Sequence, residues 1–512
     1  MKEQKEKKSS TSSRYLDLRY DVHLHLFNKT FLAKELYFRL IQIMHHLFAP
    51  EEEDTKKALF APFDKISLII QAIKRINNFL HIGFQSNSIK VCNDLNRYYK
   101  NKFILTPLMF DMTYCFVSAA IHGKNHLKPV DENIFLEMKK IEFLQNIENL
   151  KQSYSMNLRV SSDVCKSSDE LLLEIDEVTK EFKMLTDDLT KFNQIETVCK
   201  LQPSSDLGGI PGEDAGFKEQ IRQLDELKNT RRYKSKVFPF LAVDPRRPGI
   251  LEYLKKNVGR GKRFIGIKLY SPNGYSPTDP LLFESSKNCN CIYKFCEKNH
   301  IPVTVHNSFG GFATFMNQIE ITGDIYTPDG LKYLNKELYS FQYSFLTKPG
   351  NAIRERALLL NHPSLWEKVL KKYPNLYINF AHFGGSDCLE KAIDNVNDLE
   401  SGNWGQKIIE LIKTYPNAYT DLSCFIEFTI LKKLKNSSIY LDIKEHVLYG
   451  SDFYFIMLAE NDFKKNIKNF KDVFADDFNL ISRDNPKRFL KHVIKWKDLT
   501  SKVSKSLKEG FI

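Results

Sequence analysis

Four histidines and one aspartate stand where they could bind a divalent cation together. His23 and His25 lie two positions apart in an apolar run, and residues two apart on a strand point to the same face. His306 and His382 each end another apolar run, and Asp452 closely follows a third. Imidazole nitrogens suit zinc and related ions, and an aspartate oxygen can complete such a site while still accepting a proton. These spacings predict a metal site, provided that the chain brings the five side chains together.

Each of the five residues also has a purely structural explanation when it is taken alone. A buried histidine often bonds a backbone carbonyl, and an aspartate after a strand often caps the next helix. The metal interpretation therefore depends on all five residues lying at the ends of strands.

Eight short runs of β-branched and aromatic residues predict eight strands, each followed by a polar loop and an amphipathic helix pattern. The predicted strands are residues 20–26, 103–110, 237–243, 264–269, 302–306, 376–382, 418–422 and 445–450. Parallel strands need crossovers of a dozen or more residues, which helices supply, so we expect an α/β fold of the (β/α)8 TIM-barrel type. The carboxyl ends of all eight strands would surround one mouth, where the histidines and Asp452 would meet.

A large helical insertion is predicted between the second and third strands. Apolar residues at alternating spacings of four and three over 171–192 are typical of a coiled-coil seam. Residues 132–154 are its expected partner in an antiparallel hairpin, although the seam would fit the barrel wall equally well. The interval 309–359 is a candidate lid over the mouth.

These patterns divide the chain into four kinds of segment. We expect a disordered lead-in over residues 1–15, the barrel over 16–126 and 236–495, the helical insertion over 127–235 and a C-terminal tail over 496–512.

Composition excludes several classes of protein. An apolar share of 42% and a charged share of 27% exclude collagen-like and wholly disordered chains. Neither a run of roughly 18 apolar residues nor a signal peptide is present, so we expect a cytoplasmic protein without a membrane partner. Nine cysteines, thinly spread, favour free thiols. The net charge of +12 comes without a nucleic-acid-binding motif, so a nucleic-acid partner is not favoured.

The motifs together resemble the amidohydrolase superfamily of metal-dependent (β/α)8 barrel enzymes, and within it amidohydrolase family 2. The family pattern is H-x-H on the first strand, a histidine after the fifth, another after the sixth and an aspartate after the eighth. Here these positions are His23 and His25, His306, His382 in His-Phe-Gly-Gly, and Asp452 in Gly-Ser-Asp. The resemblance covers the first strand and residues 237–490, but not the helical insertion.

The resemblance implies a cofactor and roles for these residues. One divalent ion, Zn²⁺ with Mn²⁺ or Fe²⁺ as alternatives, would be held by His23, His25 and His306, with His382 and Asp452 also in the ligand set. Such an ion lowers the pKa of a bound water from about 16 towards 7. Asp452 would take the proton and pass it to the leaving group, and His382 would orient water or polarise the substrate carbonyl.

Four further residues are candidates for the site. Lys268 is interpreted as a carboxylated bridge between two ions, a catalytic partner of a substrate carboxylate or a structural ion pair, and we favour a single metal. Arg246 or Arg247 would form a forked contact with a substrate carboxylate, or an arginine would pair with Asp244 to fix its loop. Tyr270 would line the pocket or pack in the core.

We therefore expect a metal-dependent hydrolase that cleaves a C–N or C–O bond in a small, carboxylate-bearing substrate. The same ligand set in the resembled family also serves nonoxidative decarboxylases of aromatic or unsaturated acids, so a decarboxylase is the alternative. A third hypothesis is a barrel scaffold that binds protein or nucleic acid through its helical insertion. A homodimer is expected from the habit of the family.

Overall fold

Eight parallel strands form the centre of the structure, a computed structural model. It describes residues 18–28, 62–111, 113–115, 140–152, 167–196, 215–284, 290–344, 348–460 and 462–494. The eight strands are β1 Arg19–Leu24, β2 Phe103–Pro107, β3 Phe240–Val243, β4 Gly266–Leu269, β5 Val303–Ser308, β8 Ile378–Gly384, β9 Ala418–Asp421 and β10 Val447–Leu448. All eight predicted strands are confirmed, with ends that differ by a few residues.

The strands form two sheets that meet at their edges. Six strands pair in the order β10-β9-β8-β5-β4-β3, and β1 pairs with β2. Isolated parallel bridges join β2 to the β3 side at Leu105–Val237 and Leu108–Phe240, and join Leu24 of β1 to Phe453 beyond β10. The α/β class and the parallel sheet fit the predicted TIM barrel, but the strand pairing does not close continuously around it.

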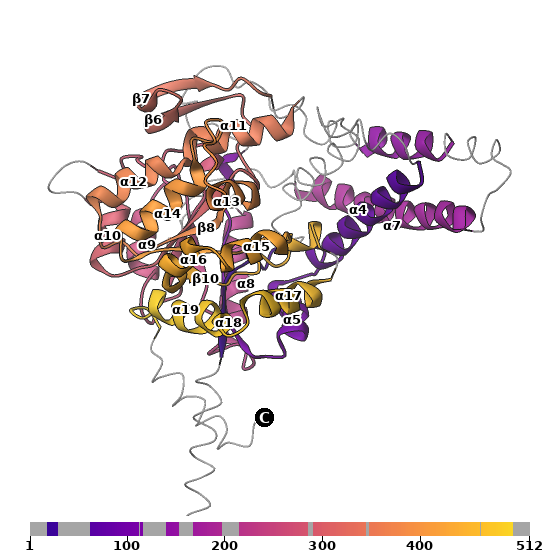
Figure 1. The fold of residues 1–512 in the computed structure, drawn as a ribbon. Helices are drawn as coiled ribbons and strands as arrows, with labels where there is room; N and C mark the ends of the chain where they lie inside the picture. Colours follow the sequence, from indigo (N-terminus) through magenta and orange to yellow (C-terminus); the bar gives the residue numbers. More distant parts are fainter. Residues whose placement is uncertain are drawn as a thin grey trace, which may run out of the picture.

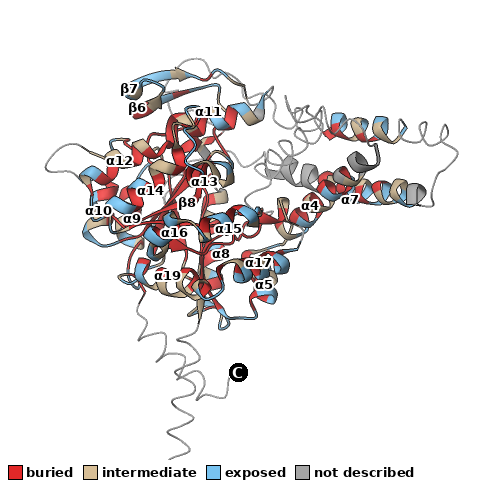
Figure 2. Ribbon diagram, viewed as in Figure 1, coloured by how far each residue is buried: buried red, intermediate tan, exposed pale blue. Residues whose placement is uncertain are grey.

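Helices surround the strands and bury their apolar faces against them (Figures 1 and 2). The apolar runs are buried on both faces of the sheet, which is typical of parallel sheets covered by crossover helices. The helices of this layer are α5 Ser88–Tyr99, α8 Ala215–Asn229, α9 Ile250–Asn257, α10 Ile292–Lys298, α11 Pro349–Asn361, α12 Pro363–Lys372, α13 Ser386–Ile393, α14 Trp404–Thr414, α15 Phe428–Lys435, α16 Ser438–Ile443, α17 Phe463–Phe474, α18 Asp477–Asn479 and α19 Asn485–Phe489.

A group of helices projects from one side of the barrel (Figure 1). Helix α7, Ser167–Glu196, follows β2 in the chain and runs antiparallel to the helical residues 140–152, since Lys151 pairs with Asp176 at 2.5 Å and Lys140 pairs with Asp187. Helix α4, Pro62–Gly83, also packs on α7, where the Asn77 amide donates to the Val178 carbonyl at 3.1 Å. The predicted seam over residues 171–192 therefore packs on helices. One of these, α4, lies before β2 in the chain and was not expected.

The segment between β5 and β8 contains a β-hairpin that the lid prediction did not include. Strands β6, Gln318–Thr327, and β7, Gly330–Ser340, pair antiparallel. Alternating burial along β6 turns Ile319 and Ile321 inward, a period-two signal that strand rules could have found.

The predicted boundaries of the four segments fall partly outside the described residues. The lead-in over 1–15 and the tail over 496–512 lie outside the described residues. The limits 127–235 of the insertion and the two barrel segments stay predictions. Within the described part of the chain, no helix has both the length and the apolarity needed to cross a bilayer.

Candidate active site

A cavity of about 450 Å³ opens where the strands end at their carboxyl side. Its polar lining includes the residues that the sequence singled out: His23, His25, Lys268, Tyr270, His306, His382 and Asp452. Its apolar walls are largely aromatic: Phe110, Phe309, Phe312, Phe425 and Phe455. The barrel topology has therefore brought together side chains that are hundreds of positions apart in the sequence.

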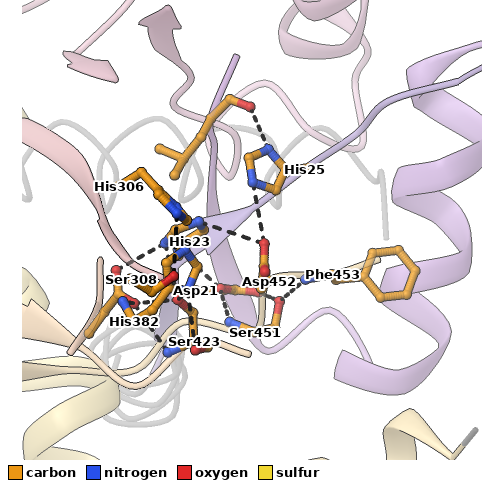
Figure 3. Close-up of polar contacts among 12 residues, drawn as sticks. Asp21, His23, His25, His306, Ser308, His382, Ser423, Ser451, Asp452 and Phe453 are labelled. Carbon is orange, nitrogen blue, oxygen red and sulfur yellow. Dashed lines mark hydrogen bonds and ion pairs between the residues drawn. The ribbon is translucent and has the colours of Figure 1, made fainter. Parts of the chain in front are cut away.

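The carboxylate of Asp452 faces both histidines of the H-x-H motif (Figure 3). Its Oδ1 lies 3.3 Å from Nε2 of His25 and 3.7 Å from Nε2 of His23. The Asp452 amide donates to the His23 carbonyl at 2.7 Å, which ties the end of β10 to β1. These three residues form one of two groups of metal-ligand donors whose atoms lie within 4.8 Å of one another among the described residues. The second group is His23, His382 and Asp421.

Hydrogen bonds at Nδ1 determine which nitrogen of each ring faces the cavity. His25 Nδ1 lies 3.1 Å from the Leu108 carbonyl and His23 Nδ1 lies 3.0 Å from Asp421 Oδ2. His382 Nδ1 lies 3.3 Å from the Ser423 carbonyl. Carbonyl and carboxylate oxygens only accept hydrogen bonds, so each Nδ1 must carry a proton, and Nε2 of each neutral ring keeps its lone pair.

Burial keeps the imidazoles of His23 and His382 in the form that binds metal. It lowers the pKa of His23 to about 3, although Asp421 opposes this shift, and it also lowers the pKa of His382. For Asp452, burial acts to raise the pKa, but the side chains of His25, His23 and His382 around the carboxylate hold the pKa below its usual value. At neutral pH the site therefore presents lone-pair nitrogens and an ionised carboxylate, which is what a divalent cation requires.

His306 lies at the edge of this group. Its Nε2 is 2.8 Å from the Gly310 carbonyl, so Nδ1 carries the lone pair of the neutral ring, and burial lowers its pKa well below the usual value. The ring stacks on Tyr270, with centroids 4.2 Å apart, and lies 4.9 Å from the ring of His382. His306 belongs to neither donor group. Its role as a metal ligand stays a prediction, as do the roles assigned to the other site residues.

Lys268 on β4 points a buried amine toward the site. Its Nζ has no hydrogen-bond partner among the described residues. Burial lowers the pKa of this amine to about 8, while the carboxylates of Asp421 and Asp452 act to raise it. An orphaned buried amine indicates a site for an anionic group.

The two arginines after β3 bind carboxylates of the protein itself. Arg246 contacts Asp244 through Nε at 2.9 Å and Nη2 at 2.6 Å, which matches the loop-fixing alternative. Arg247 makes a bidentate pair with buried Asp111, with both distances 2.7 Å. Neither arginine lines the 450 Å³ cavity, whereas Arg354 on α11 does. Substrate binding by Arg246 or Arg247 therefore has no support from their position.

Two residues of this site were missed in the sequence. Asp421 ends β9 and Ser423 follows it, and both contact His23 and His382. The predicted strand 418–422 already placed an aspartate at a strand end. The rule that selected Asp452 would have selected Asp421 as well.

A model of the amidohydrolase family matches residues 218–491, more than half of the chain. The search of curated proteins found no match to this chain. One similar solved structure is a probable 2-pyrone-4,6-dicarboxylic acid hydrolase from Acinetobacter baumannii with citric acid bound: 13% identity, 54% of this chain and 78% of that chain covered, TM-score 0.30. Another is an amidohydrolase from Burkholderia multivorans with bound HEPES. It has 12% identity and a TM-score of 0.34, and the match covers 54% of this chain and 79% of that chain.

A third similar structure is 5-carboxyvanillate decarboxylase from Sphingomonas paucimobilis, with 11% identity, 56% and 77% coverage and a TM-score of 0.32. The assignment of the family rests on the sequence match over residues 218–491 and on the motifs within it. The chain belongs to amidohydrolase family 2, whose members are metal-dependent hydrolases and decarboxylases.

Proposed function

We propose that the protein is a metal-dependent hydrolase whose cation is held by His23, His25 and Asp452. The observation that carries this proposal is the convergence of two lone-pair nitrogens on one carboxylate oxygen, at 3.3 and 3.7 Å. Atoms that all offer electron pairs repel one another unless a cation lies among them. The mixed nitrogen and oxygen donor set suits zinc, with manganese or iron as alternatives.

A divalent cation at this position supplies Lewis acidity and makes hydroxide available near neutral pH. Asp452, an ionised carboxylate beside this position, accepts the proton of the attacking water and returns it to the leaving group. His382 has an unprotonated Nε2, so it suits accepting a hydrogen bond from water better than donating one to a substrate carbonyl. Lys268 donates from the cavity floor to an anionic group of the substrate.

The rim of the cavity supports a carboxylate-bearing substrate. Arg354 lies at the rim with its guanidinium 5.0 Å from the ring centroid of Phe309, and it makes no ion pair with any described residue. A guanidinium held by an aromatic ring is well placed to form a forked contact with a carboxylate. We therefore assign to Arg354 the anchoring role first expected of Arg246 or Arg247.

A nonoxidative decarboxylase is the second candidate, and Lys268 is the observation that favours it. This buried amine, which has no hydrogen-bond partner in the part of the chain that the structure describes, stands beside the metal-binding group and would bind a carboxylate at the reacting end of the substrate. A hydrolase that acts on an amide or lactone has less need of a cation at this place.

One experiment separates the two candidates. The purified, zinc-loaded protein is incubated with a panel of lactones, amides and aromatic acids, with Asp452→Asn as the inactive control. Release of carbon dioxide favours the decarboxylase, and a new carboxyl group formed from an amide or lactone favours the hydrolase. Salt-dependent retention of nucleic acid without metal-dependent turnover would favour the scaffold hypothesis. Cytoplasmic location and a homodimer stay predictions.

A further inference from the structure

The carboxylate of Asp421 is saturated with hydrogen bonds. This residue is fully buried at the end of β9. Its Oδ2 accepts from Nδ1 of His23 at 3.0 Å and from the Asn379 amide at 2.7 Å. Its Oδ1 accepts from the backbone amides of His382, at 3.0 Å, and Ser423, at 3.1 Å, and from the Ser423 hydroxyl. Because both oxygens are occupied by donors, Asp421 is better suited to orient its neighbours than to bind a cation itself.

The donor count around Ser423 allows one arrangement of protons. A serine hydroxyl has one proton to donate and two lone pairs to accept with. The Ser423 hydroxyl donates to Asp421, so it must accept from Nδ1 of His382, 2.9 Å away, and from Nδ1 of His23, 3.1 Å away. Both rings then carry their proton on Nδ1 and present a lone pair at Nε2. The network is satisfied only when the Asp421 carboxylate is ionised.

Asp421 also stabilises the backbone at the tip of β8. His382 has φ of 67° and Phe383 has φ of 48°, a left-handed conformation that is costly for residues other than glycine. The hydrogen bond from the His382 amide to Asp421 Oδ1 keeps this turn in place. One carboxylate thus determines both the ring orientation of His23 and the position of His382.

We infer that Asp421, acting with Ser423, is the positioning residue that directs Nε2 of His23 at the cation and Nε2 of His382 into the cavity. This inference rests on the proposed metal site. It adds a role for β9, whose end sets the geometry of two of the imidazoles. Partners of this kind typically contribute 10- to 100-fold to metal affinity.

The test is Asp421→Asn, which nearly preserves shape. The asparagine side chain has one accepting oxygen and one NH2 donor. The NH2 group of the variant would therefore face either the Nδ1–H of His23 or the backbone amides of His382 and Ser423, which are themselves donors. We expect Zn²⁺ affinity to fall about 10- to 100-fold, measured by competition with a chromogenic chelator on protein whose folding is verified by circular dichroism. Asp324→Asn is the matched control, because Asp324 is also buried and accepts from Lys368 and Thr278, but lies on β6 outside the cavity.

A second variant keeps the test decisive if Asp421→Asn does not fold. Ser423→Ala removes the shared hydroxyl and leaves the carboxylate, and we expect Zn²⁺ affinity about 2- to 10-fold weaker, the effect of losing one hydrogen bond. Native affinity in a folded Asp421→Asn or in Ser423→Ala, or an equal loss in Asp324→Asn, would overturn the inference and leave the metal site standing. A native protein that binds no Zn²⁺ would overturn both.

Discussion

Lys268→Met tests whether the buried amine of Lys268 is a free, functional group. Burial lowers the pKa of this amine from 10.5 to about 8. The unfolded chain therefore binds a proton more tightly than the folded chain, and the charged amine destabilises the fold at pH 7. A difference of 2.5 pKa units corresponds to about 3 kcal/mol. Methionine is similar in length and uncharged, so we expect the metal-free variant to be more stable by about this amount.

The charged amine of Lys268 destabilises the fold at every pH at which it is protonated, but the size of this destabilisation depends on pH. The penalty is complete below pH 8 and disappears above pH 10.5, the two pKa values of the amine. With an unfolding entropy of roughly 1 kcal/mol/K for a chain of this length, the midpoint of thermal unfolding should rise by about 3 °C at pH 7. At pH 10 the rise should be below about 1 °C.

The assay is thermal unfolding of chelator-treated protein at both pH values. Lys332→Met, at an exposed position on β7, is the control, and it should change stability by less than about 0.5 kcal/mol. Turnover of Lys268→Met should be lost while its stability increases, a common trade-off at active sites. A lower unfolding midpoint at pH 7 would refute the reasoning, because it would mean that the amine has an anionic partner or is carboxylated.

Three further substitutions probe the cavity and its support. Arg354→Gln should raise KM for carboxylate substrates about tenfold or more with little change in kcat, because one charge-assisted contact is lost; an unchanged KM would contradict the anchoring role. Gly311→Ala should reduce kcat, since a Cβ there would lie 2.2 Å from the Tyr270 hydroxyl, whereas Gly330→Ala, at a similar φ in open space, should not. Asp111→Asn should destabilise the fold by about 3 kcal/mol in urea unfolding while zinc content is retained, because it removes the negative charge from a buried bidentate ion pair.

Much of the fold could be predicted because its signals are local. Each barrel strand is a short apolar run followed by a polar loop, and such runs need no partner to be recognised. The tips of these strands then placed His23, His306, His382 and Asp452 near one another by the rules of barrel topology alone. The cavity lining confirms that these residues are neighbours.

What could not be predicted depends on contacts between distant segments. The pairing of Arg247 with Asp111 joins residues 136 positions apart, and no local pattern marks it. The packing of α4 on α7 likewise joins residues 101 and 104 positions apart. Arg354 lies in an interval first interpreted as a lid, and only the return of α11 toward the barrel brings it to the cavity.

The central claim is that His23, His25 and Asp452 hold a divalent cation, and its most direct test is metal content. The experiment compares the native protein with His25→Ala, Asp452→Ala and the control Asp324→Asn. Each protein is purified without chelator, equilibrated with Zn²⁺ and desalted, and its metal content is measured by inductively coupled plasma mass spectrometry. We predict about one ion per chain in the native protein and the control, and a severalfold loss in both site variants with folding retained. A metal-free native protein, or site variants that keep a full complement of metal, would contradict the account.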